Sequence, residues 1–266
     1  MADIPFNCTM CGKCCHDHSL PLTFDEAIMW LEDGGHLHLF CDAAASPVAE
    51  DPAQVALAAY RIRRAFAARC GSARIHVVTT LVGVIKGPCR NLGPDMRCQI
   101  YDRRPLVCRI YPAEVNPFYE FDTARKACPP EAWTQGGTLV SNGDPVDKDT
   151  LALIAESRRR DAEDAPRKRR LCRALGIDAA SIAGEGFAIH LRNTGTVLKA
   201  LYETKDGPAD EGPDDTDWRL YSPNAETAGT LRDAGFNAVS QKQKNDTFWY
   251  ESAAAMPKLR AASAAA

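Results

Sequence analysis

The sequence lacks the motifs that identify several large enzyme classes. It contains no Gly-x-Ser-x-Gly nucleophile motif, no Gly-x4-Gly-Lys-Ser/Thr phosphate loop, no Gly-x-Gly-x2-Gly motif and no His-Glu-x2-His motif. If the protein is an enzyme, none of these motifs identifies its catalytic residues, which are therefore unknown. Any catalytic chemistry is then expected at a bound metal.

A long hydrophobic segment and a strong net charge are also absent. No apolar run approaches the ~20 residues of a membrane-spanning helix, and residues 1–6 are not a basic segment followed by an apolar one. A formal net charge of -3 and an isoelectric point near 6.1 provide no general attraction to nucleic acid or anionic lipid. We therefore expect a cytoplasmic protein without a membrane or nucleic-acid partner.

Two basic runs, at 158–160 and 167–170, are the exceptions to this even charge distribution. Acidic residues are interleaved with both runs, whereas a nucleic-acid interface needs positive charge gathered on one surface. We expect the runs to lie on solvated faces of two helices.

Cysteine is the residue that this chain has in abundance. There are eleven cysteines, an odd number that is unusual for a secreted disulfide protein. Residues 8–15 read Cys-Thr-Met-Cys-Gly-Lys-Cys-Cys. Two residues between thiolates let both sulfurs bind one ion from a tight turn, for which Gly12 supplies backbone freedom. A thioredoxin-like role is disfavoured because no βαβ unit precedes Cys8.

Four further cysteines follow at wider spacing, and thiolates bind zinc and iron centres strongly. The predicted metal ligands are Cys8, Cys11, Cys14, Cys15, Cys89, Cys98, Cys108 and Cys128. Neighbouring side chains in an extended segment point to opposite sides, so we expect Cys14 and Cys15 to serve different metal atoms. The set suffices for two four-thiolate sites, for a 4Fe-4S cluster plus a structural ion, or for a polynuclear centre. Zinc and iron both remain open.

These cysteines resemble a bacterial family pattern. The similar residues are Cys8-x2-Cys11-Gly12-x-Cys14-Cys15, Gly87-Pro88-Cys89, Cys98-x-Ile100-Tyr101-x2-Arg104-Pro105-x2-Cys108-x2-Tyr111-Pro112 and Cys128-Pro129. They resemble the YkgJ-type or CxxCxxCC cysteine-cluster proteins over residues 6 to 130. The resemblance implies a zinc- or iron-chelating domain. Through the related cysteine region of flagellin lysine N-methylases, it also implies an iron–sulfur cluster.

Residues beside the cysteines are candidates for supporting roles. We assign Arg104 and Tyr101 to cofactor binding, because a guanidinium near thiolates lowers their pKa and offsets their charge. His18 stands where a ferredoxin run Cys-x2-Cys-x2-Cys-x3-Cys places its fourth cysteine. His16 and His18 are either ligands or exposed polar residues.

Three cysteines fall outside the family pattern. A free cysteine behaves as a small buried hydrophobic residue, so we predict structural roles for Cys41, Cys70 and Cys172. Cys41 is the alternative ligand among them because it belongs to the N-terminal region.

The expected fold class is α+β. We predict an irregular cysteine-rich domain at 1–135, followed after a turn-rich loop by a C-terminal region at 146–260. Within the first domain, Thr23 and Glu26 form a predicted capping box, a second helix starts at 51–52 and continues toward 69, and 75–85 is a strand. The C-terminal region begins with helices over the two basic runs. It ends in a β-α-β-β unit whose last two strands, 236–240 and 247–251, are expected to pair.

Two functions remain in view. The first is a cytoplasmic metal-binding protein that holds zinc, iron or both through the cysteine cluster. The second is an iron or iron–sulfur enzyme that transfers a group to, or oxidises, a peptide or small molecule. A closed, fully thiolate-ligated site favours the first function, and an open coordination position or a substrate pocket favours the second.

Overall fold

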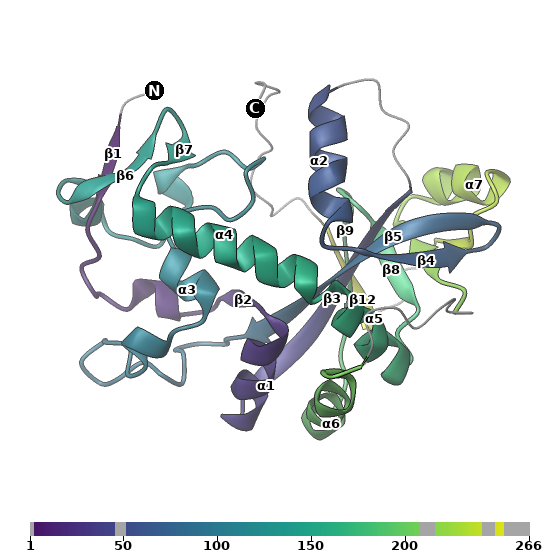
Figure 1. Ribbon diagram of the computed structural model, residues 1–266, viewed down its shortest axis with the longest axis horizontal. Helices are drawn as coiled ribbons and strands as arrows, with labels where there is room; N and C mark the ends of the chain where they lie inside the picture. The colour runs from purple at the N-terminus through teal and green to yellow at the C-terminus, as the bar shows by residue number, and fades with distance from the viewer. Residues whose placement is uncertain (1–2, 46–51, 208–215, 241–247, 253–266) are drawn as a thin grey trace. The chain divides into compact units, whose positions relative to one another are not determined.

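The computed structural model describes residues 3–45, 52–207, 216–240 and 248–252 as a mixed α/β protein with a large mixed sheet (Figure 1). Contacts divide the chain into two compact units. Among the described residues, unit 1 contains those within 3–22 and 83–160, and unit 2 contains those within 23–82 and 161–252. These units are discontinuous in sequence and do not follow the predicted ranges 1–135 and 146–260, which remain a prediction.

Unit 2 contains most of the large sheet. Its helices are α1 (Phe24–Glu32), α2 (Pro52–Ile62), α5 (Ala165–Ala174), α6 (Thr194–Thr204) and α7 (Ala225–Asp233). Its strands are β3 (His36–Ala45), β4 (Phe66–Cys70), β8 (Ala179–Ile182), β9 (Gly186–His190), β10 (Arg219–Tyr221), β11 (Ala238–Val239) and β12 (Phe248–Ser252). Strand β5 (Ala73–Val84) passes from unit 2 into unit 1.

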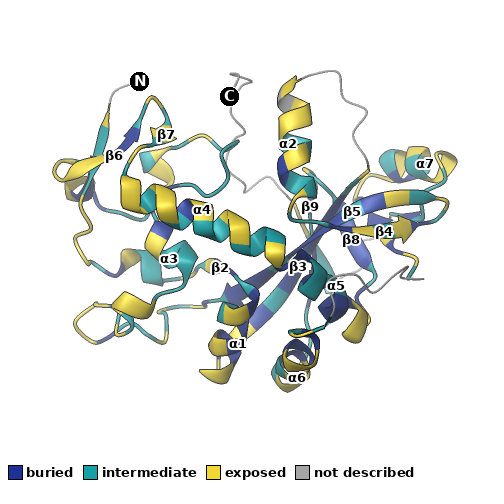
Figure 2. Ribbon diagram, viewed as in Figure 1, coloured by how far each residue is buried: buried dark blue, intermediate teal, exposed yellow. Residues whose placement is uncertain are grey.

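The sheet of unit 2 combines parallel and antiparallel pairs. Strands β11, β10, β8 and β3 are adjacent in this order and run parallel, while β5 follows on the far side of β3. Strand β9 pairs antiparallel with β3, β12 with β9, and β4 with β5. Buried residues lie on both faces of β3 and β5, as expected for central strands covered by helices (Figure 2).

Several local predictions are confirmed in this unit. The Thr23 side chain accepts a hydrogen bond from the Glu26 backbone, and the Glu26 carboxylate accepts one from Thr23 N at 2.9 Å, which completes the capping box of α1. Strand β5 covers the predicted strand 75–85 except for its last residue, Ile85. Helix α2 begins at Pro52 as predicted, next to a residue outside the described part of the chain, but it ends at Ile62 because the following segment forms β4.

The predicted pairing of the last two strands is wrong. Strand β11 pairs with β10, whereas β12 pairs with β9, so both join the large sheet. The segment 241–247 that would connect them as a hairpin lies outside the described residues. Helix α7 is the helix expected in the β-α-β-β unit, and Asn224 is its N-cap.

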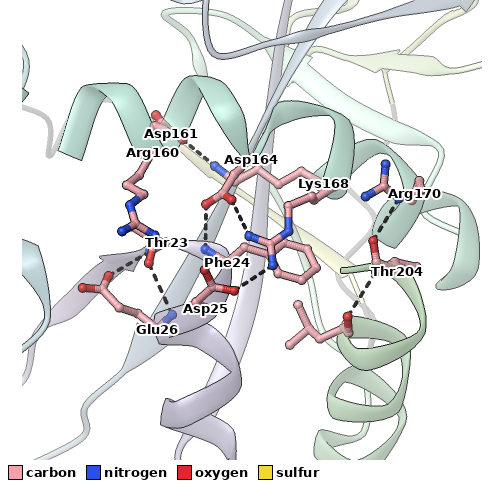
Figure 3. A network of polar contacts seen from close by, with 12 residues as sticks. Thr23, Phe24, Asp25, Glu26, Arg160, Asp161, Asp164, Lys168, Arg170 and Thr204 are labelled. Carbon is pink, nitrogen blue, oxygen red and sulfur yellow. Dashed lines mark hydrogen bonds and ion pairs between the residues drawn. The ribbon is translucent and has the colours of Figure 1, made fainter. Parts of the chain in front are cut away.

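The basic run at 167–170 is not a solvated face. Lys168 is 2% exposed and forms an ion pair with Asp161, and Arg170 is buried with its Nε donating to Thr204 O at 2.9 Å. Asp164 accepts a hydrogen bond from Phe24 N at 2.7 Å and pairs with Arg167 at 2.9 Å (Figure 3). Asp161 therefore neutralises the buried Lys168, while Asp164 connects the first turns of α1 and α5.

Unit 1 is built from short elements. It contains β1 (Ile4–Phe6), β2 (Ser19–Leu22), α3 (Leu106–Ile110), β6 (Gly137–Ser141), β7 (Asp144–Pro145) and most of α4 (Lys148–Glu163), with 3-10 helices at Lys13–Cys15, Tyr101–Arg103, Thr123–Arg125 and Pro130–Trp133. The antiparallel sheet β1-β6-β7 packs with α3 and α4 around five buried residues: Ile110, Ala113, Leu139, Val140 and Ile154. Across the described part of the chain, none of the helices combines the length and hydrophobicity that a membrane crossing needs.

Candidate metal centre

The CxxCxxCC segment forms a turn between β1 and β2. Gly12 has a φ of 69° and precedes the 3-10 helix Lys13–Cys15, and Cys15 N donates to Gly12 O at 2.9 Å. A Cβ atom at Gly12 would lie 2.6 Å from the Met96 carbonyl oxygen. Glycine is therefore required both for the left-handed backbone and for close packing against a second cysteine segment, as the sequence predicted for the turn.

Backbone hydrogen bonds attach that second segment, residues 87–98, to the turn. Cys89 N donates to Cys15 O at 2.6 Å, and residues His16 and Pro88 form an antiparallel bridge. A second antiparallel bridge joins Leu92 to Cys98. Backbone pairing therefore brings Cys15, Cys89 and Cys98 into one region of unit 1.

The last two predicted ligands follow from α3 and the loop after it. Cys108 lies in the first turn of α3, where its N–H donates to Pro105 O at 2.9 Å. The Tyr111 hydroxyl accepts a hydrogen bond from Ala127 N at 2.7 Å and also bonds the Cys128 side chain. Tyr111 thereby fixes Cys128 relative to α3.

The pKa values show that the thiols interact with one another. A hydrogen bond from Cys15 lowers the pKa of Cys14 to about 6, and the same bond raises the pKa of Cys15. Burial, with the charges of Cys14 and Cys89, raises the pKa of Cys108 to about 12. Burial, with the charges of Cys14, Cys8 and Cys11, raises the pKa of Cys128 to about 11.

Burial also raises the pKa of Cys89, with Cys98 and Cys14 adding to the effect. Each of the eight predicted ligands thus takes part in at least one thiol–thiol interaction. The thiols are neighbours without being arranged as ligands. Over the ranges that the structure describes, no three His, Cys, Asp or Glu side chains are set to hold a metal ion.

The premise used for Cys14 and Cys15 is wrong. These residues lie in a 3-10 helix rather than an extended segment, and their side chains hydrogen-bond each other. The adjacent thiols therefore lie on the same side of the chain. Their assignment to different metal atoms stays a prediction, without support from opposed directions.

Arg104 and Tyr101 stack beside the thiols. The Arg104 guanidinium carbon lies 3.6 Å from the centroid of the Tyr101 ring, and Arg104 Nε donates to Tyr101 O at 2.7 Å. The charge of Arg104 acts to lower the pKa of Cys14 and of Cys108. The ring thus holds a cation that offsets thiolate charge.

The two histidines have different surroundings. His16 Nδ1 lies 3.2 Å from Gly12 O. His18 Nε2 is buried and has no hydrogen-bond partner in the described part of the chain, and its ring lies 6.2 Å from that of Tyr111. Burial lowers the pKa of His18, so its imidazole is favoured in the neutral, metal-binding form. A buried nitrogen without a partner, in a ring that packs near Tyr111, fits a metal-binding region because Tyr111 bonds Cys128.

All eleven cysteines are free thiols. Cys41, Cys70 and Cys172 are buried, as predicted for structural residues. Thr79 Oγ1 lies 3.5 Å from Cys41 Sγ and 3.4 Å from Cys172 Sγ, so these three side chains form a polar contact inside unit 2.

Comparison with known proteins identifies the cysteine region. Residues 7–129 match the model of the CxxCxxCC family, which is described as "Putative zinc- or iron-chelating domain". No match was found among curated proteins or among solved structures. The matched range contains all eight predicted ligands and confirms the resemblance seen in the sequence. Residues 7–129, which are less than half of the 266-residue chain, are therefore similar to the CxxCxxCC family.

Proposed function

We propose that this protein is a cytoplasmic metal-binding protein that holds zinc or iron through the eight thiolates of its CxxCxxCC domain. The observation that carries the proposal is the mutual interaction of thiols from separate segments, at 8–15, 89–98, 108 and 128. Burial raises the pKa of Cys89, Cys108 and Cys128, and the negative charges of neighbouring thiolates raise it further. A bound cation removes that repulsion and favours the thiolate form.

The surrounding residues support the same function. Arg104 supplies a fixed positive charge, and Tyr111 positions Cys128. His18 offers a nitrogen donor in addition to the eight sulfurs. When bound, zinc would supply a structural crosslink, whereas iron or an iron–sulfur cluster would also supply redox chemistry.

The free state of all eleven cysteines is consistent with a reducing compartment, since disulfides are rare in the cytoplasm. The alternative function, an iron or iron–sulfur enzyme acting on a peptide or small molecule, is favoured by one observation. A cavity of about 210 Å³ in unit 1 is lined in part by Glu114 and Phe121, both of which contact Lys126 close to the Tyr111–Cys128 pair.

Anaerobic purification followed by elemental analysis, a sulfide assay and an absorption spectrum tests the proposal. We expect bound zinc or iron that is reduced by Cys98→Ser and by Cys108→Ser. Cys172→Ser, on α5 in unit 2, is the matched control and should leave the metal content unchanged. Protein that contains no metal after purification, and takes up none from added zinc or iron, contradicts the proposal. Metal loss from Cys172→Ser equal to that from Cys98→Ser would contradict the assigned ligands.

A further inference from the structure

Unit 1 contains a cavity of about 210 Å³ formed by three segments of the chain. Its lining residues are Glu114, Asn116, Pro117 and Phe121 from the loop after α3, Gly143, Asp144 and Pro145 from the β6–β7 hairpin, and Leu151, Ile154 and Arg158 from α4. An engineered apolar cavity of about 150 Å³ binds benzene, so this volume is enough for a molecule with a single ring.

One side of the cavity is apolar and preformed. Phe121 packs edge-on against Trp133, with ring centroids 6.1 Å apart, and Trp133 packs against Phe6 at 5.1 Å. Ile154 belongs to the buried core of unit 1. The apolar wall is therefore fixed by the same packing that stabilises the β1-β6-β7 sheet, as is typical of small-molecule sites.

The other side is polar and carries more negative than positive charge. Its charged groups are the carboxylates of Glu114 and Asp144 and the guanidinium of Arg158. Arg158 donates from Nε and Nη2 to Val115 O at 2.9 and 2.7 Å, so its N–H groups are directed to the backbone. Glu114 binds Lys126 through Oε1. The second oxygen of Glu114 can accept a hydrogen bond from a ligand.

We infer that this cavity binds a small organic cation, whose ammonium group is held by Glu114 and whose apolar body packs on Phe121 and Leu151. A charge-assisted hydrogen bond to the second oxygen of Glu114 provides the polar contact, and Asp144 adds another carboxylate to the lining. This inference goes beyond metal binding, and it does not require a metal.

Contacts also connect the cavity with the cysteine cluster. Lys126, the partner of Glu114, has its Nζ 5.6 Å from the Phe121 ring centroid and 5.7 Å from that of Tyr111. Tyr111 in turn bonds Cys128. A cation that competes with Lys126 for Glu114 would therefore alter the surroundings of a predicted metal ligand.

Calorimetry and ligand-observed NMR on the full chain test the inference with phenethylammonium as the probe and 3-phenylpropionate as an anion of similar size. Phenethylammonium should bind saturably and 3-phenylpropionate should not. Glu114→Gln should weaken binding about tenfold or more, equivalent to ~1.4 kcal/mol. Leu151→Trp should abolish binding by filling the cavity, and it suits a half-exposed position on α4.

Glu156→Gln, which removes an exposed acid of the same helix that pairs with Arg159, is the control and should bind as the unmodified chain does. Tighter binding of the anion, no saturable binding of phenethylammonium below about 10 mM, or binding that survives Leu151→Trp would overturn the inference. Because phenethylammonium binding is measured separately from metal content, failure of this inference is distinguishable from failure of the metal-binding proposal.

Discussion

The two units of this protein are stabilised in different ways. Unit 2 buries large side chains, including Phe24, Leu39, Ile75 and Trp218, between helices and a wide sheet. The core cluster that packs with the β1-β6-β7 sheet of unit 1 contains five buried residues, and most of its cysteine segments consist of turns and 3-10 helices. A segment with so little apolar burial needs another source of stability, which a metal bound to gathered thiolates provides.

Metal removal should produce the largest difference in stability between the two units. Chelation under reducing conditions is expected to eliminate the hydrogen-exchange protection of 12–17 and 87–99, while β3 and the unit 2 part of β5 remain protected. The expected effect is large because structural zinc contributes about 10–16 kcal/mol in small zinc-dependent domains. Unchanged exchange in a sample shown to be metal-free would contradict the difference between the units.

The buried ion pair of unit 2 provides the converse experiment. In Asp161, burial acts to raise the pKa, but Lys168 and Arg64 lower it overall, and Arg64 Nε lies 3.0 Å from Asp161 Oδ2. Asp161→Asn leaves Lys168 buried beside a neutral partner, so unfolding by urea should require about 3–5 kcal/mol less free energy. Metal content should not change. The exposed substitution Glu156→Gln should have no measurable effect on stability.

A pair of glycines tests how the cysteine turn is packed. Gly12→Ala introduces strain at a φ of 69° and a clash with Met96 O, whereas Gly87→Ala introduces strain at a φ of 72° with no atom within 4 Å of the new Cβ. We expect Gly12→Ala to lower the free energy of unfolding by about 1–3 kcal/mol. It should also lower metal affinity, measured by competition with a chromogenic chelator. Equal effects from both substitutions would show that packing against Met96 is unimportant.

We expect the smallest effect in the rates of thiol alkylation, because this experiment changes no contact in the protein. In the metal-free protein, the pKa of Cys14 is about 6 and that of Cys128 is about 11. Cys14 is therefore protonated below its pKa and ionised at neutral pH, so its alkylation rate should rise around pH 6 and then level off. Alkylation of Cys128 should still increase in the alkaline range. Peptide mapping after brief treatment with iodoacetamide measures both rates. Parallel pH profiles for the two thiols would contradict the difference between their pKa values.

Local chemistry explains what the sequence could predict of this structure. The capping box at Thr23, the glycine of the cysteine turn and the β-branched run of β5 depend on residues adjacent in the chain. The cysteine spacing likewise identified the family over residues 7–129.

Features that depend on distant residues were missed. Lys168 is buried because Asp161 lies beside it and Arg64 shares that acid, a combination that the local run of charges does not reveal. The pairing of β12 with β9 joins residues about 60 positions apart, which turn signals cannot specify. The direction of the Cys15 side chain depends on the 3-10 helix that begins after Gly12. In such a helix, neighbouring side chains do not point to alternate sides as they do in a strand.

Differential alkylation of the metal-loaded and metal-free protein measures which thiols the metal protects, when peptide mapping and metal analysis are made on the same anaerobic sample. We predict that metal protects all eight cluster thiols and that each chain holds more than one metal atom. Cys41, Cys70 and Cys172 should react equally poorly in both samples because they are buried. One mononuclear metal per chain, with four of the eight cluster thiols alkylated in the metal-loaded protein, would contradict the prediction for the cluster.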